Sequence, residues 1–235
     1  YFLINNRADK GWFIMQSVFK KNMEANFRWH SNQPIIDSLT IKNFFNETVL
    51  DQHLARLMNE FGSPTRAHAA SMTAKRLGYA VALMIYARTK HEVLIHPNEC
   101  AFITITEEST NASWYPIYSF PLKTGEFYQN IVDWITKDLY AQTLVPLVEL
   151  LAQEKGISRV VLFENICTYI KWIFITKLQD TNTFQQLIDR PASEYGVRKQ
   201  HPLAIYQCDK SNLRKTCCLY YQTTGAVKSC STCPL

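Results

Sequence analysis

Apolar residues in the first two-fifths of the chain recur every three to four positions, the spacing of half-buried helices. One such stretch covers residues 8–29, and a second runs from residue 40 to residue 62, with Thr40 as its N-cap and Gly62 as its C-cap. A third begins at Ser63, a capping hydroxyl, followed by Pro64 at the first helical position, and continues to residue 90. The pattern predicts a helical bundle here.

Between residues 97 and 121 the pattern changes to β-branched and aromatic residues. Two runs of this kind, residues 101–106 and 114–120, are separated by a polar stretch typical of a turn. We therefore predict a β-hairpin near residues 100–120. Pro116 cannot donate a ladder hydrogen bond, so it places its strand at a sheet edge or at a bulge.

Helical spacing returns over residues 126–155 and ends at Gly156, with Pro146 expected to kink or split the helix. A further helix, capped by Ser158 and running to about residue 178, is apolar on almost all sides. A helix of that kind is expected in the middle of a fold.

After Pro191 the chain is polar, with predicted strands at residues 204–207 and just before Cys217. The elements together predict an α+β fold, a predominantly helical domain with a small antiparallel sheet and a C-terminal cysteine-rich segment. We place the helical body in residues 1–196 and the cysteine-rich segment in residues 197–235.

Charge is concentrated in that last segment. The chain has 25 basic and 20 acidic residues, and residues 197–235 carry a clear basic excess with Asp209 as their one acid. Such a segment favours a negatively charged ligand or an acidic protein partner. No basic helix or aromatic-rich basic groove is visible, so nucleic acid is not a predicted partner.

Apolar stretches are too short, or too often interrupted by charges, to form a transmembrane helix. We therefore expect a soluble protein. No glycine-rich phosphate-binding loop is visible among its 7 glycines, so no bound nucleotide is predicted.

The chain has 7 cysteines, and four of them are gathered between Thr216 and Pro234. A disulfide framework distributes an even number of cysteines through a small fold, so metal binding in a reducing compartment fits this pattern better. The remaining three have apolar neighbours and are predicted to be small buried residues: Cys100, Cys167 and Cys208.

The gathered cysteines form a Cys-Cys pair, Cys217 and Cys218, then eleven residues, then a Cys-x-x-Cys pair, Cys230 and Cys233. Thiolates select zinc or iron–sulfur centres. Adjacent side chains in a strand point to opposite faces, so the first pair needs a turn or bulge to converge. A two-iron cluster tolerates this geometry better than zinc, whose ribbons pair two Cys-x-x-Cys knuckles, although the spacing leaves zinc open.

The stretch from Arg214 to Tyr221, with the trailing Cys-Ser-Thr-Cys-Pro, resembles the C-terminal motif of the FhuF-like ferric siderophore reductases. Upstream, residues 143–148, 163–165 and 169–172 look like the helical stretch that precedes the motif in that family. The resemblance covers about the last 95 residues. The chain has eleven residues between its cysteine pairs where the family has ten, which leaves the four ligands in place.

This resemblance implies a [2Fe–2S] cluster bound by Cys217, Cys218, Cys230 and Cys233. It also implies one-electron reduction of a ferric siderophore, of hydroxamate or citrate–hydroxamate type, in the cytoplasm after import. Electrons are expected from an external donor such as a ferredoxin or flavoprotein, and a peripheral position at the inner membrane face stays open. Expected substrate-binding side chains are those of Arg214, Lys215, Tyr169 and Trp172, no catalytic residue being expected beyond the cluster.

Two alternatives remain at this point. The first is a non-catalytic binding module whose fold is stabilised by zinc bound to the four cysteines, with the basic tail binding a partner. An iron–sulfur carrier that passes electrons to another protein uses the same cluster without any siderophore.

Overall fold

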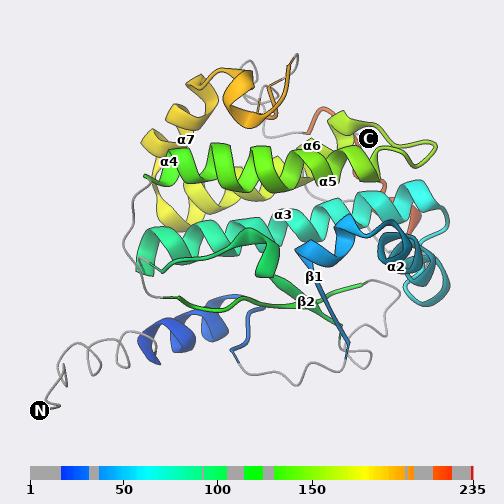
Figure 1. Ribbon diagram of the computed structural model, residues 1–235, viewed down its shortest axis with the longest axis horizontal. Coiled ribbons are helices and arrows are strands. Elements are labelled where there is room, and N and C mark those ends of the chain that lie inside the picture. Colours follow the sequence, from blue (N-terminus) through cyan, green and yellow to red (C-terminus); the bar gives the residue numbers. More distant parts are fainter. Residues whose placement is uncertain are drawn as a thin grey trace, which may run out of the picture.

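The computed structural model describes residues 17–31, 37–91, 93–104, 114–123, 130–198, 201–203, 214–223 and 234. In Figure 1 the long helix α3 crosses the molecule, with a three-stranded antiparallel sheet on one side and helices α5 and α6 on the other. The structure confirms the predicted α+β class, mostly helical with a small antiparallel sheet.

The N-terminal part is helical, as predicted, but divided into more elements. Residues 17–26 form a helix, and the predicted helix from residue 40 is instead β1 (Ser38–Thr40), the 3-10 helix η1 (Ile41–Phe45) and α2 (Glu47–Glu60). Thr40 caps η1 in a capping box with Asn43, and Asn46 caps α2 by accepting the Val49 N–H at 3.2 Å. The caps formed by Thr40 and Asn46 therefore divide the stretch that apolar spacing predicted as one helix.

Helix α3 (Arg66–His91) begins later than predicted. The Thr65 hydroxyl accepts the His68 N–H at 3.1 Å and is the capping side chain, whereas the Ser63 hydroxyl lies 2.9 Å from Nδ1 of His68. Most of α3 is buried, including polar residues such as Ser71. The helix therefore forms the centre of the fold.

The predicted hairpin is confirmed by β2 (Ala101–Ile103) and β3 (Ile117–Ser119), which pair with Ile103 opposite Ile117. The sequence pattern missed β1, which pairs with the other side of β2. Pro116 directly precedes β3, the last strand in the sheet order β1-β2-β3, as predicted for a sheet edge. Tyr118 of β3 also forms a bridge with Trp29, through hydrogen bonds with Arg28 and His30. The 3-10 helix η2 (Pro97–Glu99) leads into β2.

Helix α4 (Ile131–Asp133), the π-helical stretch η3 (Trp134–Leu144) and α5 (Val145–Leu151) follow one another without a break. The Val145 N–H bonds to the Tyr140 carbonyl, five residues back. Pro146, which lacks an N–H, lies where the bonding changes from π to α. The proline therefore marks this change and does not split the helix.

Helix α6 (Arg159–Trp172) is capped by Ser158 and continues as the π-helical stretch η4 (Ile173–Leu178). It packs against α3, with Gly78 close to the backbone of Ile166. This confirms the predicted central helix. The last elements are α7 (Thr181–Asp189), η5 (Ala192–Tyr195) and η7 (Tyr220–Gln222).

The predicted strand at residues 204–207 lies outside the described residues, whereas residues 214–217, before and at the first cysteine, form no strand. Among the described residues, no helix has the length and apolar character that crossing a bilayer requires.

Candidate metal centre and the neighbouring pocket

The cysteine-bearing segment, residues 214–223, is held on the helical body by a buried carboxylate. Glu164 of α6 is 1% exposed and accepts the backbone N–H groups of Lys215 at 2.6 Å and Thr216 at 2.7 Å. The Thr216 hydroxyl donates to the same carboxylate. Charge-assisted bonds of this kind are stronger than neutral ones, so Glu164 fixes the backbone directly before Cys217.

Arg214 balances this buried charge. Its side chain is 6% exposed, and Nη2 lies 3.9 Å from the Glu164 carboxylate. The same nitrogen donates to Oδ1 of Asn165 at 2.5 Å. The structure therefore places Arg214 within the protein, as a residue that positions the segment, and its neighbour Lys215 is the exposed cation.

A second chain of hydrogen bonds reaches Cys218 itself. The Asn165 amide donates to the carbonyl and the hydroxyl of Ser71, at 3.0 and 2.8 Å. The Ser71 hydroxyl in turn donates to the Cys218 carbonyl at 2.7 Å. Both helices, α3 and α6, thus hold the main chain of the cysteine pair.

The chain turns at the cysteine pair. Leu219 has a φ of 62°, and its N–H donates to Sγ of Cys217 at 3.3 Å. Cys218 is 1% exposed and Cys217 is half-buried, and neither forms a disulfide. This is the kind of turn that the adjacent pair was expected to need, and an N–H···S bond stabilises a thiolate.

Beyond the turn, a buried histidine holds the chain that leads toward the second cysteine pair. Nε2 of His68 lies 3.0 Å from the Thr223 hydroxyl, and Nδ1 bonds with Ser63. Burial lowers the pKa of His68 to about 4, so the ring is neutral near pH 7. One ring nitrogen donates and the other accepts, which both bonds require.

Two of the predicted substrate residues lie on α6 near this segment. Burial raises the pKa of Tyr169, while nearby Arg76 lowers it and Cys218 adds a smaller raising interaction, so the phenol lies within electrostatic reach of the cysteine pair. Trp172 lies one turn further along and stacks on Tyr79 at 6.0 Å between ring centroids. The structure therefore brings Tyr169 close to the cysteines and places Trp172 in an aromatic cluster.

The second cysteine pair, Cys230 and Cys233, lies outside the described residues, as does Cys208. Cys100 and Cys167 are fully buried, as predicted. Burial raises the pKa of Cys167 to about 12 and keeps the thiol protonated. Within the described ranges no group of three or more His, Cys, Asp or Glu side chains is arranged to hold a metal ion.

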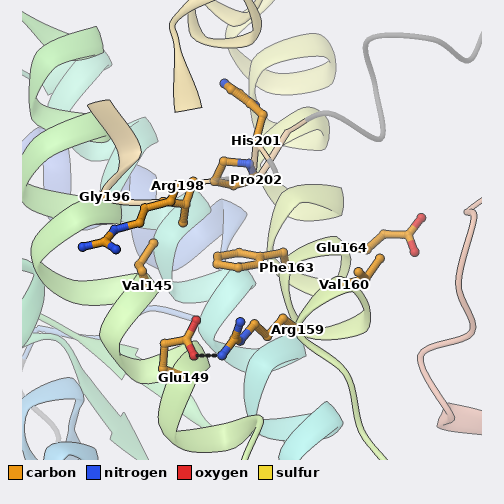
Figure 2. Close-up of a pocket in the computed structure, with 11 residues that line it drawn as sticks. Val145, Glu149, Arg159, Val160, Phe163, Glu164, Gly196, Arg198, His201 and Pro202 are labelled. Carbon is orange, nitrogen blue, oxygen red and sulfur yellow. Dashed lines mark ion pairs between the residues drawn. The ribbon is translucent and has the colours of Figure 1, made fainter. Parts of the chain in front are cut away.

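A pocket of about 650 Å³ lies on the other side of Glu164, between α5, α6 and the chain that follows η5. Figure 2 shows the Phe163 ring at its centre, the Glu149–Arg159 ion pair on one side and Arg198 on another. The Glu164 side chain points away from the other lining residues. Glu164 therefore separates the pocket from the cysteine-bearing segment.

The sequence interpretation missed the part that Glu164, Asn165, Ser71 and His68 play in holding the cysteine-bearing segment. A signal was present, because a Glu-Asn pair inside an otherwise apolar helix must find buried partners. Which partners it finds depends on a segment about 50 residues further along the chain.

A model of the family described as FhuF 2Fe-2S C-terminal domain matches residues 214–235. No curated protein matches the chain. The matched range begins at Arg214 and includes both cysteine pairs. The last residues of this chain are thus similar to the FhuF 2Fe-2S C-terminal domain, as the sequence resemblance predicted, and this similarity implies a [2Fe–2S] cluster.

Proposed function

We propose that this protein is a ferric siderophore reductase, acting in the cytoplasm on imported ferric chelates. The observation that carries the proposal is the family match over residues 214–235, combined with a cysteine pair whose backbone is anchored on both central helices. Reduction of a bound chelate requires that the cysteines which hold the cluster are fixed in place. It also requires a nearby pocket large enough for the chelate.

The residues present fit a thiolate-bound cluster. Cys217 and Cys218 are free thiols at a turn, and Cys217 already accepts an N–H bond at its sulfur. We propose that they bind the cluster together with Cys230 and Cys233. When bound, the cluster supplies single electrons at a low potential, about −400 mV in plant-type ferredoxins.

The protein side chains have the task of holding the donor and the chelate near one another. Glu164, Asn165 and Arg214 position the cysteine segment, and Ser71 fixes the carbonyl of Cys218. Tyr169 lies near the cysteine pair, and Lys215 is exposed beside it. We propose that these two side chains lie between the cluster and the bound substrate, with Trp172 behind them.

Reduction releases the iron because of ligand hardness. Hydroxamate and carboxylate oxygens are hard ligands suited to Fe(III), and they hold Fe(II) far more weakly. One electron added to the bound Fe(III) gives Fe(II), which then leaves for other acceptors. The electron is replaced by an external donor, for which we propose a ferredoxin or flavoprotein.

An iron–sulfur carrier to another protein would have the same cysteine segment, whereas a zinc module would not require the 2Fe-2S domain. The decisive test is to reduce the purified protein anaerobically, mix it with ferric hydroxamate and citrate–hydroxamate chelates, and follow the visible absorbance. Reoxidation well above that given by cluster-free protein supports the reductase. If no ferric chelate reoxidises the protein, the carrier interpretation replaces it.

The ligand set is tested separately by changing each of the four cysteines to Ser. Iron content and visible absorbance are expected to fall or shift in all four variants. Cys100→Ala is the matched control, because that thiol is fully buried directly before β2 and its loss is expected to leave the spectrum unchanged. A cysteine whose replacement leaves the spectrum unaltered is not a ligand.

A further inference from the structure

We propose that the pocket lined by α5, α6 and the described residues 196–198 and 201–202 binds the chelate, and that it selects chelates carrying a negative charge. This inference rests on the proposed function and adds the place and the charge class of the substrate. The volume of about 650 Å³ lies within the range of small-molecule sites, which is roughly 300–1,000 Å³.

The lining combines an apolar floor with a few charged groups at its edge. Val145 and Pro202 are buried, and Val160, Phe163 and Val197 are half-buried around them. Such a floor accepts the hydrocarbon linkers of a hydroxamate chelator, since apolar surface gains free energy on leaving water. The charged groups then decide which chelates bind best.

The charged residues that line the pocket in the described part of the chain differ in whether they have a partner. Arg159 pairs with Glu149 at 2.5 Å, and Glu164 turns toward the cysteine segment, as Figure 2 shows. Burial lowers the pKa of His201, so this histidine adds no charge near pH 7. Arg198 is exposed and has no acidic partner among the described residues. A carboxylate on the ligand is the complement of that guanidinium.

The position of the pocket is suited to electron transfer. Glu164 lines it and at the same time accepts the N–H of Thr216, the residue before Cys217. One side chain and one residue of main chain therefore separate the pocket wall from a predicted cluster ligand. Because electron transfer weakens steeply with distance, a chelate bound here would lie where reduction is fast.

Binding can be separated from reduction with gallium(III), which has the charge and nearly the size of Fe(III) but accepts no electron. The probes are gallium(III) desferrioxamine B and its N-acetyl and N-succinyl derivatives. They share one hydroxamate core and carry a cationic, a neutral and an anionic pendant group. Titration calorimetry on the cluster-loaded protein should give the order succinyl, acetyl, amine, with about tenfold between the extremes at low salt, falling as salt screens the charges.

Variants test which cation is responsible. Arg198→Gln should reduce the tenfold preference to about twofold, and Arg198→Glu should reverse it. Glu149→Gln frees Arg159 and should tighten the anionic probe about threefold. Lys21→Gln removes the same charge from an exposed position on the N-terminal helix and should leave all three affinities unchanged.

Equal affinities for the three probes, or equal effects of Arg198→Gln and Lys21→Gln, would overturn the inference. Reoxidation by the corresponding ferric chelates then reports on the proposed function alone. If ferric chelates reoxidise the wild type while Arg198→Gln changes neither binding nor rate, the reductase stands and the pocket assignment fails. If the gallium probes bind as expected and no ferric chelate reoxidises the protein, the pocket stands and the reductase fails.

Discussion

Helices α3 and α6 meet in two regions of opposite character. Near the cysteine segment their contact is polar, because Ser71, Glu164 and Asn165 are buried and direct their hydrogen bonds to that segment. Further along α3 the contact is close packing, with Gly78 against the backbone of Ile166 and the rings beyond. One helix pair thus contains both a docking site for the segment and an apolar contact that holds the fold.

This difference predicts how substitutions in each of the two regions should affect the protein. A polar contact is local, because its strength depends on a few matched charges and N–H groups that are costly to leave unpaired. A packed contact belongs to the whole core, so its loss affects global unfolding. The cysteine segment should therefore be able to detach while the body stays folded.

The largest local effect is expected for Glu164→Ala. It leaves Arg214 buried without its counter-charge and removes the acceptor for the N–H groups of Lys215 and Thr216. Breaking a buried pair costs about 3–5 kcal/mol. We expect iron loss and loss of visible absorbance at temperatures where far-ultraviolet circular dichroism still reports a folded body.

Two further variants serve as controls for the iron-loss measurement on Glu164→Ala. Glu164→Gln keeps the shape and one acceptor oxygen and should lose iron more slowly than Glu164→Ala. Glu149→Gln removes a carboxylate from a surface pair and should change stability by less than about 0.5 kcal/mol. An iron half-life in Glu164→Ala equal to that of the wild type would show that the polar contact does not hold the segment.

Gly78→Ala tests the packed contact. A Cβ at this position would lie 2.8 Å from the Ile166 Cα and 3.0 Å from the Asn165 carbonyl, so α6 must move. Overpacking of this kind costs about 1–3 kcal/mol, and we expect a lower urea midpoint for the whole chain. In contrast to Glu164→Ala, the loss of absorbance and the loss of helix signal should coincide.

Gly156→Ala is the matched comparison. Gly156 has a φ of 97°, but a Cβ there meets only the Ala67 side chain at 3.5 Å. The cost should be the conformational one of roughly 1 kcal/mol. A larger effect at Gly156 than at Gly78 would contradict the role assigned to the contact between α3 and α6.

A smaller, pH-dependent effect is expected from His68. Its pKa is lowered from 6.5 to about 4 by burial, so between these values the unfolded chain binds a proton that the folded chain does not. Stability therefore falls as the pH is lowered through this window and is constant above it. At pH 5 the loss due to His68 should be roughly 1–2 kcal/mol, measured by urea unfolding at pH 7 and pH 5.

Two substitutions separate the two bonds of His68. Asn can reproduce the Nδ1 bond to Ser63, and Gln can reproduce the Nε2 bond to Thr223. Both variants should lose this part of the pH dependence, while His53, with a pKa lowered to about 3, keeps its own part. Faster iron loss is expected only in His68→Asn, and equal iron loss in both variants would argue against a positioning role for the Thr223 bond.

Periodicity predicted much of the fold, because apolar spacing records which face of an element is buried. The central helix after Ser158 and the hairpin of β2 and β3 were confirmed on this basis. Thr40 was confirmed as an N-cap, but the helix that follows it ends at Phe45 and a second begins after Asn46. The boundary at Ser63 was wrong, since neighbouring polar side chains compete for the same cap and spacing does not decide between them. Strand β1 was missed because three residues have no readable period.

At the candidate site, local chemistry was predictable and long-range partners were not. The turn at Cys217 follows from two adjacent cysteines that must converge, a requirement within a few residues. The placement of Arg214 against Asn165 depends on tertiary structure, so the sequence interpretation assigned Arg214 to substrate binding, whereas the structure buries its side chain against α6. Its neighbour Lys215, which was assigned to substrate binding with it, is exposed.

The smallest effect is expected where the two regions meet, at Tyr169. No hydrogen bond to its hydroxyl is found within the described residues, so Tyr169→Phe should leave the unfolding free energy within about 0.5 kcal/mol of the wild type. Its phenol lies near Cys218, and loss of this polar group should slow reoxidation of the reduced protein by a ferric chelate about twofold to threefold.

Trp172→Phe should affect stability and not the rate. Loss of the stack on Tyr79 should lower the unfolding free energy by about 1 kcal/mol, while the reoxidation rate stays unchanged. Stopped-flow absorbance measures the reoxidation rate of both variants, and urea unfolding measures their stability. A rate effect in Trp172→Phe without loss of stability would move Trp172 from the packed region into the substrate site, whereas unchanged rates in Tyr169→Phe would remove Tyr169 from it.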